Sequence, residues 1–229
     1  MNTTAAGTVT VDIVSDVVCP WCFIGKRRLA RAMALVRAEA PGSEFAVRWH
    51  PFFLSPDTPV AGDPYRPFLE RKFGGPERLE QIFARVRDAG RGAGIEFALE
   101  KIALRANTLR AHRLIHRTQW VEGANADALV ERLFAGYFLR GENVGDISVL
   151  AAIAAECGFD GGEVATYLEG DEDAATVASS ARRAQDIGIS SVPTFIFNGA
   201  VAVTGAEDPT VLAGAIRRAR AEGGDGAGE

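Results

Sequence analysis

Alternating apolar and polar residues open the chain and predict a β-strand over residues 8–14, with Val9, Val11 and Ile13 on one face. A helix is predicted over residues 20–39, where apolar residues recur at helical spacing and Pro20 suits the first turn. A second strand follows over residues 45–54. The first quarter of the chain therefore has a strand–helix–strand pattern.

The pattern is helical from Ser55 to about Ile187, after a loop marked by four prolines at 56, 59, 64 and 67. Six helices are expected here, over about 77–89, from 107, over 125–139, from Asp146 as N-cap, over 162–169 and over 172–187. No repeat period relates them. This block is too long to be a simple connection, so it predicts a helical insertion.

Strands return near the end of the chain, over 191–197 and 201–204, on either side of a hairpin turn at Asn198-Gly199. A last helix begins after Asp208, and the glycine-rich, acidic residues 223–229 are expected to be disordered. The fold class is therefore α/β. We expect a discontinuous sheet domain (8–60 plus 188–222) that carries an all-helical insertion domain (61–187).

Composition narrows the function classes. The chain has 229 residues, of which 47% are hydrophobic and 24% charged, so it is a folded globular protein. A net charge of −5 gives no basic surface for nucleic acid or an anionic membrane. No apolar stretch approaches the ~20 residues of a membrane span, and residues 1–7 lack the features of a signal peptide. We therefore expect a cytoplasmic protein, either a monomer or a homodimer.

Candidate chemistry lies in Cys19-Pro20-Trp21-Cys22, between the first strand and the first helix. Cys19 falls at the helix N-terminus, where unpaired N–H groups and the helix dipole favour a negative sulfur. Cys22 lies one turn further on the apolar stripe, so it should be covered and have the higher pKa. This arrangement predicts a redox dithiol in which an accessible Cys19 attacks and Cys22 resolves the mixed disulfide.

Less specific readings of the same residues remain open. The cysteine pair is also compatible with half of a zinc site or with a coincidental buried pair, although no paired ligands accompany it. Among the polar residues nearby, Asp16 is expected to cap or face water and His50 to pack inside. Around the dithiol, only Trp21 and part of Phe23 should be exposed.

Elsewhere, His112 and His116 are four residues apart, the spacing of a metal pair. The arginines between them favour a polar helix face or an inter-domain contact instead, so no metal is predicted. The third cysteine, Cys157, is expected on a buried stripe and should be inert.

These motifs together resemble the DsbA family of the thioredoxin superfamily. The resemblance covers about Thr8 to Ala221 and rests on the dithiol and on Val192-Pro193-Thr194 at the start of a late strand. The stretches 15–22, 49–56 and 107–115 are similar to the FrnE-like branch, which is related to the 2-hydroxychromene-2-carboxylate isomerases. The resemblance implies a thioredoxin-like fold with a large helical insertion that roofs the site.

The resemblance also implies a cis peptide bond before Pro193, packed against the dithiol, with Val192 and Pro193 holding substrate beside Pro20 and Trp21. A turn proline without that role would look the same in the sequence. This chain departs from thioredoxin-type enzymes at Ile13, where they often keep a buried carboxylate, so the Cys22 proton must use water or another group.

Three functions follow as hypotheses. The leading one is a cytosolic thiol–disulfide oxidoreductase or protein disulfide isomerase, which uses Cys19 and Cys22 on protein thiols or disulfides and needs no cofactor. The second is a glutathione-dependent isomerase or transferase acting on an aromatic or polyketide-like molecule, with glutathione as co-substrate. Relatives of that second kind usually carry serine where this chain has Cys19, so the two thiols favour redox chemistry. The third is a non-catalytic module that binds a peptide in the cleft.

Overall fold

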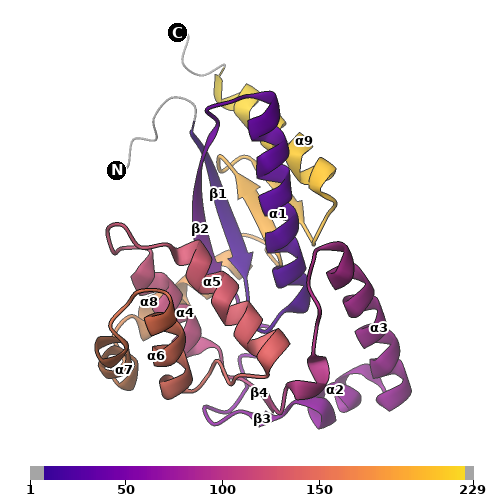
Figure 1. The fold of residues 1–229 in the computed structure, drawn as a ribbon, viewed down its shortest axis with the longest axis vertical. Helices are drawn as coiled ribbons and strands as arrows, with labels where there is room; N and C mark the ends of the chain where they lie inside the picture. The colour runs from indigo at the N-terminus through magenta and orange to yellow at the C-terminus, as the bar shows by residue number, and fades with distance from the viewer. Residues whose placement is uncertain (1–7, 225–229) are drawn as a thin grey trace.

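The computed structural model describes residues 8–224, without the side chains of 223 and 224. Its main sheet has the strand order β2-β1-β5-β6. Strands β1 (Thr8–Ser15) and β2 (Glu44–Pro51) run parallel. Strands β5 (Thr194–Phe197) and β6 (Val201–Thr204) form the antiparallel side, and β5 pairs with β1. The central strand β1 therefore pairs with one strand from the start of the chain and one from near its end (Figure 1).

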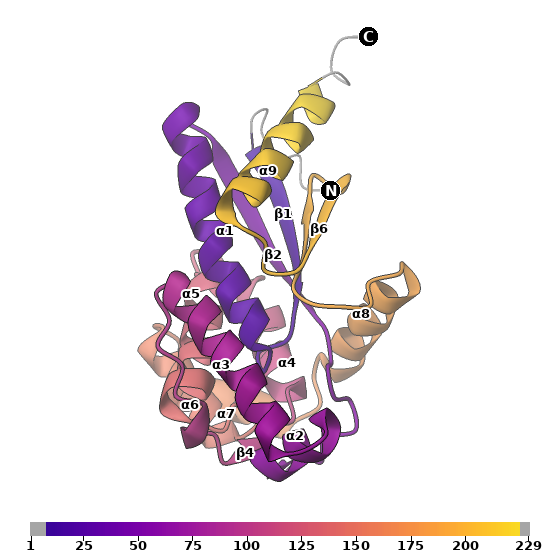
Figure 2. The ribbon, with the colours of Figure 1, turned by 90° about the vertical axis from the view of Figure 1, so that its right-hand side faces the viewer.

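The two faces of β1 are covered by different helices. Val9, Val11 and Ile13 are buried in the main core, together with residues of α1 (Pro20–Glu39) and α9 (Pro209–Gly224). On the other face, Val14 packs with a residue of α8 (Ala174–Asp186). Figure 2 shows α8 on the side of the sheet away from α1. The period-2 pattern of the sequence thus arises because successive β1 side chains point alternately toward the two helical layers.

The segment between β2 and α8 is mainly helical and lies at the end of the sheet that carries the start of α1 (Figure 1). A two-stranded sheet, of β3 (Asp63–Pro64) and β4 (Leu104–Arg105), lies within it. Its helices are α2 (Tyr65–Phe73), α3 (Pro76–Gly92), η1 (Leu99–Lys101), α4 (Leu109–Thr118), α5 (Ala126–Ala135), the π-helical η2 (Gly136–Arg140), α6 (Ile147–Glu156) and α7 (Gly161–Glu169).

One continuous core joins the sheet to these helices. Phe23 of α1 is fully buried and stacks on Phe134 of α5 with ring centroids 5.1 Å apart. On the same helix, Lys26 forms ion pairs with Asp127 (2.8 Å) and Glu131 (3.0 Å) of α5. These contacts fix the first turns of α1 against the helical segment.

The outer edge of β2 is closed by a side chain. The Gln119 amide accepts a hydrogen bond from the Trp49 backbone N–H (2.7 Å) and donates one to the Trp49 carbonyl (3.1 Å). Gln119 is the C-cap residue of α4, so it holds that helix alongside the strand.

The expected α/β class and helical insertion are confirmed, and α1 has the predicted bounds. Three details differ. Strand β2 ends at Pro51 instead of residue 54, and β5 begins at Thr194 instead of 191. Helix α2 lies in the stretch predicted as a loop, because Pro64 and Pro67 both fit near a helix N-terminus, where a missing N–H costs little.

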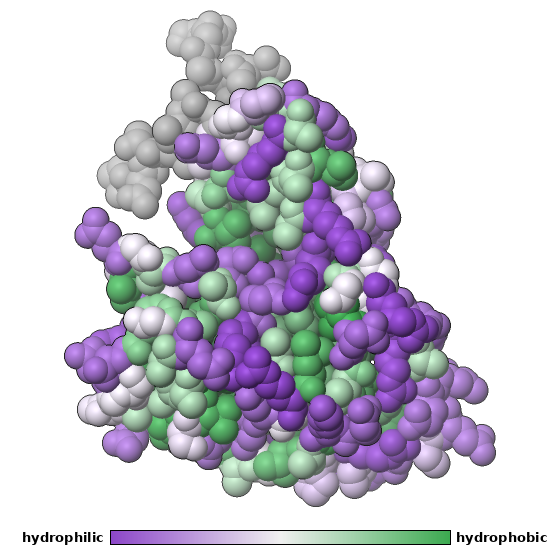
Figure 3. All heavy atoms as spheres, in the orientation of Figure 1, coloured by the Kyte–Doolittle hydropathy of each residue, from purple (hydrophilic) through white to green (hydrophobic). Residues whose placement is uncertain are grey.

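The division into two domains stays a prediction. Residues 223 and 224 belong to α9, which corrects the start of the predicted tail, and residues 225–229 lie outside the described part. Within residues 8–224, no helix is both long and apolar enough to cross a lipid bilayer. Figure 3 shows hydrophilic residues across much of one face, with apolar residues between them.

Candidate active site

The dithiol is built on the turn that links β1 to α1. After Ser15, the chain turns so that the Cys19 N–H donates to the Asp16 carbonyl (3.0 Å). Cys19 is the N-cap residue of α1, Pro20 occupies the first turn, and the Cys19 carbonyl accepts the Cys22 N–H (3.0 Å). The sulfur of Cys19 therefore lies where the helix dipole favours negative charge, as the sequence predicted.

Cys22 lies one helical turn deeper and is 1% exposed. Burial raises the pKa of its thiol well above the usual value, and the neighbouring Cys19 raises it further, while the Ser15 hydroxyl and the Asp16 backbone act in the opposite direction. The Ser15 hydroxyl is itself buried and has no hydrogen-bond partner among the described residues. The expected burial of Cys22 is therefore confirmed.

Access to Cys19 is narrower than expected. The residue is only 4% exposed, although the sequence predicted an accessible sulfur. The reason is that the helical segment and the strand-β5 side both approach the turn, and the Cys19 thiol donates to the Val192 carbonyl oxygen across a distance of 3.8 Å. A partner must reach the sulfur as a slender group.

Among the predicted substrate-binding residues, Val192 contacts this sulfur through its carbonyl. The Val192–Pro193 peptide bond is cis, as expected. A Cβ atom on Gly25 would lie 2.8 Å from the Pro193 ring, so α1 approaches the proline closely only because residue 25 is glycine. Trp21 is 40% exposed, as predicted.

Two predictions about the surroundings are wrong. Phe23 is fully buried, because its ring belongs to the core between α1 and α5. Asp16 does not face water but is 1% exposed, and its carboxylate accepts the Leu54 N–H (2.9 Å) and lies 3.3 Å from His112 Nε2. The loop after β2 and helix α4 cover it from both sides.

The Asp16–His112 contact joins the dithiol turn to the helical segment. His112 is 5% exposed and comes from α4, so the expectation of an inter-domain contact fits better than that of a metal ligand. The Asp16 carbonyl also accepts the Cys19 backbone N–H, and the Asp16 backbone opposes the rise in the Cys22 pKa. Asp16 is thus a positioning residue for the dithiol turn.

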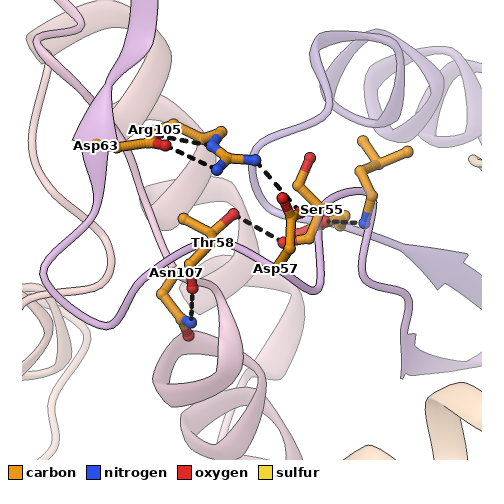
Figure 4. A network of polar contacts seen from close by, with 8 residues as sticks. Ser55, Asp57, Thr58, Asp63, Arg105 and Asn107 are labelled. Carbon is orange, nitrogen blue, oxygen red and sulfur yellow. Dashed lines mark hydrogen bonds and ion pairs between the residues drawn. The ribbon is translucent and has the colours of Figure 1, made fainter. Parts of the chain in front are cut away.

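The loop after β2 is fastened over the site by a polar network (Figure 4). Arg105 of β4 is buried and donates two hydrogen bonds of 2.8 Å to the Asp63 carboxylate. The guanidinium lowers the pKa of Asp63, and the carboxylate raises that of Arg105. Asn107 donates to the Thr58 carbonyl (2.7 Å), which ties the same loop to the start of α4.

Tyr65, the first residue of α2, is a site neighbour that the sequence did not indicate. It is 8% exposed, and its pKa is raised chiefly by burial and also by the nearby Cys19. The helical segment therefore contributes a buried phenol to the surroundings of the dithiol.

The remaining candidates have other environments. His50 is half-exposed rather than interior, because its Nε2 pairs with Asp12 Oδ1 at 2.7 Å on the outer face of the sheet. Cys157 is half-buried at the C-cap of α6, and burial raises the pKa of its thiol, which makes it less reactive. In the described part of the chain, no three His, Cys, Asp or Glu side chains converge as metal ligands would.

A parallel-antiparallel sheet with a dithiol at the mouth of its first helix, a cis-proline beside the sulfurs and a helical insertion above them defines a thiol–disulfide oxidoreductase of the DsbA kind. The chain belongs to the DSBA-like thioredoxin domain family, whose model matches residues 10–217. The thioredoxin-like fold with a helical insertion is thereby confirmed.

Individual relatives agree with this assignment. The chain is 27% identical over 210 residues to the uncharacterized protein YwbO of Bacillus subtilis, covering 91% of this chain and 96% of that protein. It is similar to the crystal structure of a probable DsbA oxidoreductase from Streptomyces coelicolor, with a TM-score of 0.83, 27% identity and coverage of 93% and 91%.

A more distant structure shares the fold alone. The cytosolic disulfide reductase DsbM from Pseudomonas aeruginosa, solved with glutathione, has a TM-score of 0.61, 19% identity and coverage of 94% of this chain and 98% of that one.

Proposed function

We propose that this chain is a cytosolic thiol–disulfide oxidoreductase that acts through Cys19 and Cys22. The observation that carries the proposal is the asymmetry of the dithiol. Cys19 lies at a helix N-terminus beside the Val192 carbonyl, whereas Cys22 is buried one turn below with a raised pKa. Such a pair is typical of an attacking and a resolving thiol.

The exchange would proceed in two balanced steps. The Cys19 thiolate attacks one sulfur of a substrate disulfide, which forms a mixed disulfide and releases the other sulfur as a thiolate that takes up a proton. Cys22 then loses its proton and attacks Cys19 Sγ, which releases the second substrate thiol and leaves a Cys19–Cys22 disulfide. Two thiols of the glutathione class would restore the dithiol and become oxidised to a disulfide.

The narrow opening at Cys19 favours slender partners. Because the residue is 4% exposed, a small disulfide or an extended peptide segment can reach the sulfur more easily than a rigid protein surface. The Val192 carbonyl beside the Cys19 sulfur offers an acceptor for the backbone of such a segment. We therefore propose glutathione-type disulfides and unfolded protein segments as substrates.

A cytosolic location is supported by the chain's three cysteines, too few for a disulfide framework, and by the shared fold of DsbM, which is described as cytosolic. Cell fractionation with an antibody against the intact protein tests it. Recovery in a secreted or membrane fraction would contradict this part.

The chemistry is tested by insulin reduction with glutathione as the electron source. Cys19→Ser should reduce the rate to the uncatalysed background, and Cys157→Ser, which changes the cysteine outside the dithiol, should leave it unchanged. Cys22→Ser should accumulate a mixed disulfide that mass spectrometry detects on Cys19. Equal rates for wild type and Cys19→Ser would refute the role of Cys19.

A further inference from the structure

A cavity of about 570 Å³ lies between β2, α4 and α8 and reaches the dithiol turn at Ser15 and Val17. This volume is within the range of small-molecule sites. Neither cysteine of the dithiol, nor Val192 or Pro193, is among its lining residues. Both α4 and α8 contact β2, and these elements lie near one another in Figure 1.

The three histidines of the chain all line this one cavity. Each directs Nε2 toward a carboxylate that is not part of the lining. The pairs are His50 with Asp12 (2.7 Å), His112 with Asp16 (3.3 Å) and His116 with Asp173 (3.9 Å). Those contacts leave Nδ1 of each ring unused by the described residues. A carboxylate on one ring nitrogen holds the imidazole in a fixed orientation for a ligand at the other.

Two arginines add unpaired positive charge. Arg48 of β2 and Arg183 of α8 both line the cavity, and neither forms an ion pair within residues 8–224. None of the fourteen lining residues is Asp or Glu, although the chain as a whole has a net charge of −5. A concave surface of one sign concentrates ligands of the opposite sign, and the guanidinium fork fits a carboxylate or a phosphate.

The rest of the lining is mixed, with apolar side chains beside the polar Ser15, Gln119 and Ser180. Val17 and Ile115 line the cavity, and Trp120, which is 79% exposed, offers an indole that does not belong to the core. A metal ion does not suit the site, because the arginines repel a cation and the described residues contain no converging group of three metal ligands. We infer that the cavity binds a small organic oxyanion, a carboxylate or phosphate monoester on a flat apolar body.

Isothermal titration of the full chain tests this inference. The probes are 1-naphthoate, 1-naphthyl phosphate and the neutral 1-naphthamide. We expect saturable binding of at least one anionic probe and binding of the amide that is weaker by about tenfold, since a charge-assisted hydrogen bond is roughly twice as strong as a neutral one. Which anion binds more tightly identifies the oxyanion as carboxylate or phosphate.

Matched variants locate the site. Arg183→Ala and Arg48→Ala should each weaken anion binding by about fivefold or more, for the loss of one charged partner. Arg182→Ala removes a neighbouring exposed arginine of α8 that does not line the cavity, so it should bind as wild type does. Cys19→Ser should also bind normally, which separates this inference from the redox function.

Three results would overturn the inference: no binding of either anion at millimolar concentration, equal binding of the neutral amide, or equal losses for Arg182→Ala and Arg183→Ala. All the arginines changed are exposed, and circular dichroism of each variant checks that it is folded.

Discussion

Replacing His112 by alanine removes the partner of a buried carboxylate and thus measures how the helical segment holds the dithiol turn. In the folded protein, Asp16 Oδ1 lies 3.3 Å from His112 Nε2, and Oδ2 accepts the Leu54 N–H at 2.9 Å. With exposures of 1% and 5%, the two side chains have little contact with water outside the cavity that His112 lines. After His112→Ala, Asp16 keeps a single hydrogen bond.

The size of the effect follows from that accounting. Removing one partner of a buried hydrogen-bonded pair costs about 1–3 kcal/mol, because the group left behind stays buried without that partner. Asp16→Ala loses two hydrogen bonds and leaves the imidazole unpaired, which costs about 2–4 kcal/mol. The double variant removes both groups together, so its loss should be smaller than the sum of the single losses by about 1–3 kcal/mol.

Urea unfolding of the four proteins gives the coupling free energy directly. Insulin reduction should fall in both single variants, because the Asp16 side chain holds the dithiol turn through Leu54 and His112. Additive losses within about 0.5 kcal/mol would refute the claim that the pair interacts. Full activity in Asp16→Ala would refute its positioning role.

Three further predictions rest on single features. Because burial raises the Cys22 pKa, peptide mapping of reduced protein after iodoacetamide at pH 7 should show much slower labelling than for an ordinary cysteine, and labelling should quicken as pH rises; labelling at the ordinary rate contradicts this. Arg105→Gln removes the group that lowers the Asp63 pKa, and a lowered pKa stabilises the fold only above the unfolded value of about 3.9. The stability gap between wild type and Arg105→Gln should therefore be full near neutral pH and shrink as pH falls below about 4, whereas a gap that widens in acid would exclude this linkage. Gly25→Ala brings a Cβ to 2.8 Å from a proline ring and should destabilise the protein by about 1–3 kcal/mol, whereas Gly214→Ala, with nothing within 4 Å in α9, should stabilise it by about 0.5–1 kcal/mol; thermal unfolding distinguishes the two, and equal effects would count against the close approach.

The elements with strong periodicity could be predicted from the sequence. Helix α1 and strand β1 have short-range patterns that match their final environment, and the late Val192-Pro193 motif matched a known family. Helix α2 could not be predicted in the same way, because local proline content outweighed a weak apolar pattern.

The polar neighbours of the dithiol depend on contacts between distant segments. Asp16 and His112 are 96 residues apart, and their burial results from the packing of α4 against the turn after β1. The sequence did indicate the burial of Ser15. This residue lies two positions after Ile13 in the same strand, so its side chain points to the same face as the core. For Tyr65, no local signal placed it near Cys19, because its position depends on how the insertion folds back.

The Gln119 amide has a consequence for assembly. By taking both the N–H and the carbonyl of Trp49, one side chain imitates a neighbouring strand for a single residue and stops there. A residue whose hydrogen-bonding groups are already engaged cannot template further pairing. At this position the outer strand is thereby protected from pairing with another strand, at the cost of one glutamine and no extra backbone.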